Sequence, residues 1–169
     1  QNPLRGTAPN LTIEENLALA YTRKASPSFF ALNKKDSAYF REVLSTLGMG
    51  LEDRMKTKIG LLSGGQRQAA SLLMATIAEP ELLLLDEHTA ALDPGAAEKV
   101  MALTKKIVEE NKITTLMITH DMEYALEYGS RTIMLDSGKI VMDLTGKERE
   151  EMTTGKLAEL FYGKAHKKG

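Results

Sequence analysis

Two short stretches constrain this chain more than any other feature. Residues 62–66 read Leu-Ser-Gly-Gly-Gln and precede an Ala-, Leu- and Met-rich segment that is predicted to be a buried helix. Residues 82–87 are four leucines and two acids, which is typical of a central parallel strand covered on both faces. A glycine-rich helix start binds anions, and carboxylates at a strand end can hold a metal and activate water. Together the stretches indicate nucleotide triphosphate chemistry.

The order of the predicted elements indicates an α/β fold. Strand–helix–strand connections imply right-handed crossovers and a parallel sheet, with ligands beyond the carboxyl ends of the strands. We therefore expect Asp86, Glu87 and His120, which follow two of the strands, at one sheet edge. Helices are predicted at 12–24, 39–47, 66–78, 94–110, 121–128 and 156–161; strands at 82–85, 114–119 and 131–136; a hairpin partner at 139–144; and a loop at 25–35 anchored by Phe29 and Phe30.

Composition excludes several classes of function. The formal net charge is -1, so electrostatics provide no general argument for a nucleic-acid partner. The chain has no cysteine, which rules out disulfides and thiolate metal sites. No apolar run approaches the roughly 20 residues that a membrane-spanning helix needs. An enzyme or binding module built on the two stretches remains.

Each candidate site also has a simpler structural explanation. An acidic pair after a strand is more often a helix N-cap, a lone histidine in a loop often has no ligand, and Ser-Gly pairs are common in turns. A phosphate loop would need Gly-Lys followed by Ser or Thr. The Gly-Lys pairs here are followed by Ile140, Glu148, Leu157 and Ala165, so none qualifies.

Four motifs in order nevertheless resemble the ATP-binding subunit of an ABC transporter. They are Leu-Ser-Gly-Gly-Gln at 62–66, the leucine strand with Asp-Glu at 82–87, Ala-Leu-Asp at 91–93 and Thr-His-Asp at 119–121. Residues 1–3 and 11–16 resemble the family's glutamine loop and the start of its helical subdomain. The resemblance covers essentially the whole chain.

The resemblance implies the C-terminal part of a P-loop NTPase (RecA-like) parallel-sheet core plus an α-helical subdomain. Residues 1–79 would hold the glutamine loop, helical subdomain and signature helix. Residues 80–146 would hold the core part with Walker B, D-loop and switch histidine, and residues 147–169 the tail. His88 departs from the family's usual proline and Ala90 from its common serine.

The resemblance also assigns roles to individual residues, with ATP and Mg²⁺ as cofactors. The signature motif would contact the γ-phosphate of ATP held by a second subunit, and Asp93 would lie in the loop linking the two sites. The signature residues are Ser63, Gly64, Gly65 and Gln66. Asp86 would associate with Mg²⁺, Glu87 would be the general base, His120 the switch histidine, and Gln1 the sensor of Mg²⁺ and attacking water.

The implied function is ATP hydrolysis by a dimer, most simply a homodimer, that energises solute transport through separate permease subunits. The implied location is the cytoplasm, at the inner face of the membrane, with a solute-binding protein as a further partner. Alternatives are a non-transport ABC ATPase acting as a DNA- or ribosome-associated clamp, a truncated regulatory partner, or an α/β binding module with chance motifs. Because the chain starts at Gln1 and lacks a phosphate loop, we expect an N-terminally truncated fragment, inactive by itself.

Overall fold

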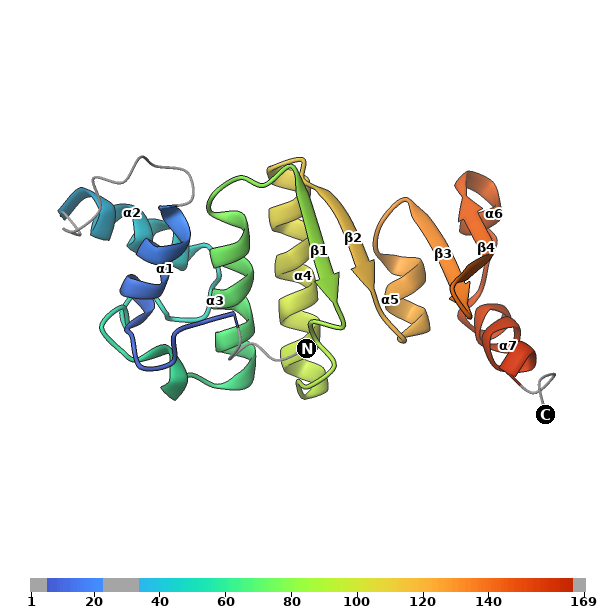
Figure 1. Ribbon diagram of the computed structural model, residues 1–169, viewed down its shortest axis with the longest axis horizontal. Helices are drawn as coiled ribbons and strands as arrows, with labels where there is room; N and C mark the ends of the chain where they lie inside the picture. Colours follow the sequence, from blue (N-terminus) through green and yellow to red (C-terminus); the bar gives the residue numbers. More distant parts are fainter. Residues whose placement is uncertain (1–5, 23–33, 166–169) are drawn as a thin grey trace. The chain divides into compact units, whose positions relative to one another are not determined.

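The computed structural model describes residues 6–22 and 34–165 (Figure 1). The chain divides into two compact units, Gln1–Met117 and Ile118–Gly169. Gln1 and the predicted anchors Phe29 and Phe30 lie outside the described residues.

The first unit begins with three helices, α1 (Ile13–Tyr21), α2 (Lys34–Ser45) and α3 (Gly64–Thr76), with a short 3-10 turn at Ile59–Leu61. The predicted capping box of α1 is confirmed, because Thr12 and Glu15 exchange side-chain and backbone hydrogen bonds. Helix α2 begins before the predicted residue 39, and the chain turns at Gly48 with a φ of 61°.

The helices enclose a shared apolar core. Their buried side chains recur at helical spacing, so that each helix directs one stripe toward the others. Of the residues in α3, only Gly64 and Ala75 are exposed, which confirms the predicted burial of this helix. Core side chains of the three helices include Ile13, Leu17, Phe40, Leu44, Ala69, Leu72 and Leu73.

A strand–helix–strand segment completes the first unit. Strand β1 (Leu82–Asp86) leads into α4 (Pro94–Glu110), which returns the chain to β2 (Thr114–Ile118). Strands β1 and β2 are hydrogen-bonded neighbours, and Figure 1 shows that they run in the same direction. This confirms the predicted parallel α/β arrangement.

The leucine strand is buried on one face only, so the prediction that both faces are covered is wrong for this structure. Leu83 and Leu85 join the apolar core together with α4 side chains, whereas Leu82 and Leu84 are 54% and 65% exposed. Leu116 on the neighbouring strand is 53% exposed. Successive strand side chains point to opposite faces, and within the described residues only one face of β1 is packed.

The second unit is built around an antiparallel hairpin. Strands β3 (Arg131–Asp136) and β4 (Lys139–Thr145) pair through the predicted turn at Ser137 and Gly138, which have φ values of 51° and 75°. Helix α5 (Met122–Glu127) precedes the hairpin, and α6 (Gly146–Glu150) and α7 (Thr154–Ala165) follow it. Helix α6 was not predicted, and α7 is longer than predicted.

Arg149 explains the position of α6. Its guanidinium donates to the Thr132 hydroxyl at 3.0 Å and to the carbonyl oxygens of Leu126 and Tyr128 at 2.6 and 2.9 Å. One side chain therefore ties α6 to β3 and to the end of α5.

Among the described residues, no helix has both the length and the apolar character needed to cross a membrane.

Candidate functional site

The Ser63–Gln66 turn is a closed capping box at the start of α3. The Ser63 hydroxyl accepts from the Gln66 backbone N–H, and the Gln66 side chain accepts from the Ser63 backbone N–H, both at 3.3 Å. Gln66 also donates to the Met49 carbonyl oxygen and accepts from Arg54, each at 3.4 Å. The predicted helix start is therefore confirmed. Met49 and Arg54, in the loop that precedes the helix, hold the Gln66 side chain in place.

The two glycines of this turn allow it to lie directly against the start of α4. A Cβ on Gly64 would lie 3.2 Å from Leu92 Cδ2, and a Cβ on Gly65 would lie 3.1 Å from Ala96 Cβ. Both distances are tighter than an ordinary van der Waals contact, so a side chain at either position would require its neighbour to shift by a few tenths of an ångström. The structure thus brings together two stretches that the sequence analysis singled out separately, the Ser63–Gln66 turn and the segment around Asp93.

Asp93 caps α4. Its carboxylate accepts from the Ala96 backbone N–H at 3.0 Å, and Pro94 occupies the first helical position. The close approach of Gly64 to Leu92 and of Gly65 to Ala96 shows that the N-termini of α3 and α4 lie side by side. First-turn N–H groups of a helix lack intrahelical partners and carry positive partial charge, so Ser63 and Gly64, both exposed, border a surface suited to phosphate oxygens.

The acidic pair lies where β1 enters a tight turn. Asp86 is exposed at the strand end, and Glu87 is half-buried with a φ of 45°. The Glu87 carbonyl oxygen accepts from the Ala90 N–H at 3.0 Å. Among the described residues, the other non-glycine residues with positive φ follow helices or lie in the β3–β4 hairpin turn, whereas Glu87 lies between a strand and a helix. A left-handed conformation there costs about 1–3 kcal/mol and is characteristic of functional sites.

His88, the next residue, is buried against α4. Its Nε2 lies 3.1 Å from the Thr104 hydroxyl, which donates to the Val100 carbonyl oxygen at 2.7 Å. Because the single hydroxyl proton is used on Val100, Thr104 accepts, and the His88 Nε2 carries the hydrogen. Burial lowers the pKa of His88, which favours this neutral form.

The positions of the remaining predicted site residues relative to these are not tested by the structure. His120 is exposed two residues after β2 and belongs to the second unit, where Asp121 caps α5. Its proximity to Asp86 and Glu87 therefore stays a prediction. Gln1 lies outside the described residues. The catalytic and ligand-binding roles of all these residues likewise stay predictions.

The chemistry of the donor set fits Mg²⁺ held jointly with a nucleotide. Across the described residues, no three His, Asp or Glu side chains gather as a metal site. Mg²⁺ normally keeps several waters and binds through one or two carboxylates plus phosphate oxygens, so it requires no cage of protein ligands. An exposed Asp86 at the strand end meets that requirement.

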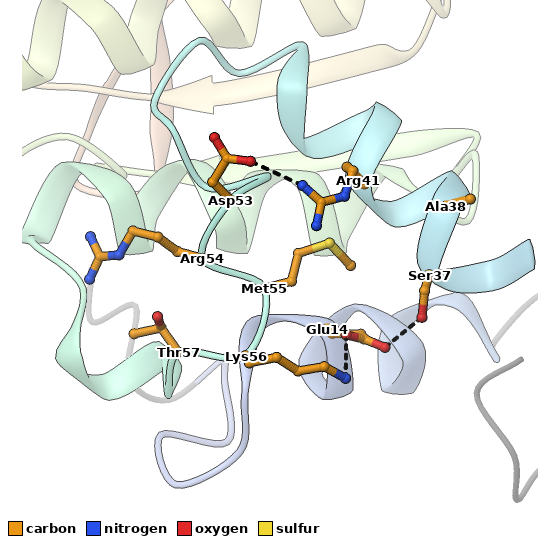
Figure 2. Close-up of a pocket in the computed structure, with 9 residues that line it drawn as sticks. All are labelled: Glu14, Ser37, Ala38, Arg41, Asp53, Arg54, Met55, Lys56 and Thr57. Carbon is orange, nitrogen blue, oxygen red and sulfur yellow. Dashed lines mark hydrogen bonds and ion pairs between the residues drawn. The ribbon is translucent and has the colours of Figure 1, made fainter. Parts of the chain in front are cut away.

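A separate hollow of about 530 Å³ lies between α1, α2 and residues 53–57 (Figure 2). At its base the Glu14 carboxylate accepts from the Ser37 hydroxyl at 2.6 Å and pairs with Lys56 at 2.9 Å. Burial alone would raise the pKa of Glu14, but the hydrogen bonds from Ser37 and Lys56 and the charge of Lys56 hold that pKa below its usual value. Glu14 thus joins three segments that are distant in sequence.

Sequence reasoning missed several of these contacts. Nothing local marks Arg54 as a partner of Gln66, or Ser37 as a partner of Glu14. A weak signal existed for Thr104, because a threonine within the apolar stripe of α4 needs a buried hydrogen-bond partner. Only the structure shows that His88 is this hydrogen-bond partner of Thr104.

Comparisons with known proteins identify the family of this chain. The family model described as "ABC transporter" matches residues 1–90. A tyrosine transport ATP-binding protein of Clostridioides difficile (strain R20291) is 43% identical over 161 residues, which cover 95% of this chain and 64% of the relative. The methionine import ATP-binding protein MetN of Clostridium tetani is 39% identical over 109 residues, which cover 63% of this chain and 34% of the relative. This chain thus spans less than two thirds of either relative.

Two solved structures show the same fold. A dimeric ATP-binding cassette bound to ADP and Pi is 32% identical with a TM-score of 0.66, over 82% of this chain and 58% of that one. An ABC transporter in an inward-facing conformation is 24% identical with a TM-score of 0.72, over 92% of this chain and 61% of that one. With the matched family model and the shared fold, this chain belongs to the ABC transporter family.

Proposed function

We propose that this chain is part of an ATP-binding subunit that hydrolyses ATP as a dimer and energises solute import through separate membrane subunits. The observation that carries the proposal is the packing of the Ser63–Gln66 turn on the capped start of α4, in the same unit as β1 and its acidic pair. Family membership and relatives that bear the names of transport ATP-binding proteins support it.

Each residue has a distinct task in this proposal. The exposed N-terminus of α3, with Ser63, Gly64, Gly65 and Gln66, binds the γ-phosphate of the nucleotide held by the partner subunit. Asp93 supports that contact by fixing the start of α4 against the turn. The half-buried Glu87 accepts the proton of the attacking water. His120 and Gln1 contact the γ-phosphate and the water, respectively.

Asp86 is the residue proposed to hold Mg²⁺ together with the phosphates. When bound, the metal neutralises charge on the phosphate oxygens during in-line transfer to water. The chain's own contribution is positioning, because phosphoryl transfer depends on alignment and charge stabilisation more than on covalent chemistry.

We propose that the assembly contains two ATP-binding subunits, permease subunits and a solute-binding protein. The ATP-binding subunits would lie at the cytoplasmic face of a membrane. The solute is proposed to be an amino acid or similarly small molecule. The names of two relatives, a tyrosine transport and a methionine import protein, support this choice. The division into residues 1–79, 80–146 and 147–169 stays a proposal as well.

The exposed leucines of β1 and β2 fit the same proposal. Leaving side chains such as Leu84 and Leu116 in water forgoes about 25 cal/mol for each Å² of apolar surface that could be buried. We propose that the part of the ATP-binding subunit that this chain does not span covers that face. It would also supply the phosphate loop that the sequence lacks.

The test is ATP turnover by the full-length subunit with and without Glu87→Gln. We expect the variant to bind ATP with unchanged affinity and to lose turnover by at least about 10²-fold, because the amide cannot accept the proton. Comparable turnover by the variant would remove Glu87 as the base. The purified 169-residue chain serves as a control and is expected to show negligible hydrolysis, since it has no phosphate loop.

A further inference from the structure

The turn that bears Glu87 is attached to α4 at both ends. Asp93, at its far end, caps the first turn of α4 through the Ala96 N–H at 3.0 Å. His88, at its near end, reaches the Thr104 hydroxyl at 3.1 Å, well inside the same helix. Between these anchors the chain reverses through the bond from the Ala90 N–H to the Glu87 carbonyl oxygen.

The His88 anchor bears directly on the backbone of Glu87. Glu87 has a φ of 45°, a left-handed conformation that is uncommon for a non-glycine residue and costs free energy. Its neighbour His88 is 8% exposed and Thr104 is 5% exposed, so their hydrogen bond is shielded from water. A shielded bond one residue from a strained position can hold that position in place.

We propose that His88 is a positioning residue for Glu87: through its hydrogen bond to Thr104, it holds the turn in the conformation that directs the Glu87 carboxylate to its substrate water. This inference rests on the proposed function, because it assigns to Glu87 the role of base. His88 itself touches neither nucleotide nor water in this scheme.

The partner hydroxyl offers a clean perturbation. Thr104→Val keeps the shape of the side chain and removes the hydroxyl, while Thr104→Ser keeps the hydroxyl. Thr76 provides a matched control, since it is 7% exposed and its hydroxyl also donates to the carbonyl four residues earlier, at 2.9 Å. Among the described residues, no side chain donates a hydrogen bond to the Thr76 hydroxyl. Thr76→Val therefore removes the bond within the helix without removing a contact to another segment.

The experiment measures ATP turnover by the full-length subunit together with amide hydrogen exchange. For Thr104→Val we expect kcat to fall by about 10- to 100-fold with little change in KM for ATP, by analogy with the loss of partners that orient metal ligands. The Ala90 amide, which reports the Glu87 turn, should exchange at least about 10-fold faster, because its free energy of opening falls by about 1.4 kcal/mol or more. Thr104→Ser and Thr76→Val should both leave kcat and the Ala90 exchange rate close to those of the unmodified subunit.

Several outcomes would overturn the inference. An unchanged kcat or an unchanged Ala90 exchange rate in Thr104→Val would do so, as would an equal loss in Thr76→Val. Failure of the proposed function looks different. In that case the unmodified subunit shows no turnover, or Glu87→Gln retains it, while the Ala90 exchange rate still reports whether His88 and Thr104 hold the turn.

Discussion

The Glu14 contacts predict that one serine hydroxyl in α2 contributes measurably to stability. Ser37→Ala removes a 2.6 Å hydrogen bond to a carboxylate whose side chain is only 4% exposed. Hydrogen bonds to charged groups are worth about 1.5–3 kcal/mol. We therefore expect the free energy of unfolding to fall by about 1.5–3 kcal/mol relative to a matched control.

The control is Ser45→Ala in the same helix. Alanine has a higher helix propensity than serine, so both variants share a gain that would otherwise mask part of the loss. The Ser45 hydroxyl donates only to the nearby Glu42 carbonyl oxygen, at an exposed site. Urea unfolding at neutral pH, with the midpoints and slopes of both variants compared, gives the difference.

The pH dependence tests the charged nature of the contact. The pKa of Glu14 in the folded chain is below its ordinary value of 4.5, so the associated stability is present above that value and is lost as pH falls through the folded pKa. The difference between Ser37→Ala and Ser45→Ala should therefore shrink as the solution becomes more acidic than pH 4.5. Equal stabilities at pH 7, or a difference that acid does not reduce, would refute the reasoning.

Substitutions at two further sites test local geometry by the same unfolding measurement. Gly60→Ala should destabilise the chain by about 1–3 kcal/mol, because the new Cβ would lie 2.8 Å from the Pro9 carbonyl oxygen and backbone would have to move. Asp93→Ala should cost about 1 kcal/mol through loss of the α4 cap, whereas Asp93→Asn should retain most of it; equal losses in the two would contradict the capping role.

Local sequence patterns predicted most of the elements. The Thr12 capping box, the Asp93-Pro94 start of α4 and the Ser137-Gly138 hairpin turn are encoded within a few residues, so they can be read without knowing the fold. The order of strand, helix and strand then indicated the parallel pairing of β1 and β2. Helix α6 was missed because Arg149 holds it through contacts with residues 126–132, which no local pattern encodes.

The candidate site likewise has features that the sequence predicts and features that only the tertiary structure shows. The sequence by itself supplied the prediction of which residues carry the chemistry, because Ser63, Asp86 and Glu87 occur in short motifs with characteristic spacing. Only the tertiary structure decided how they are held, since hydrogen bonds such as His88 to Thr104 join residues far apart in the chain. It also decided that β1 is packed on one face. A run of leucines reports the apolar character of both faces, but burial depends on which other segments are there to cover them.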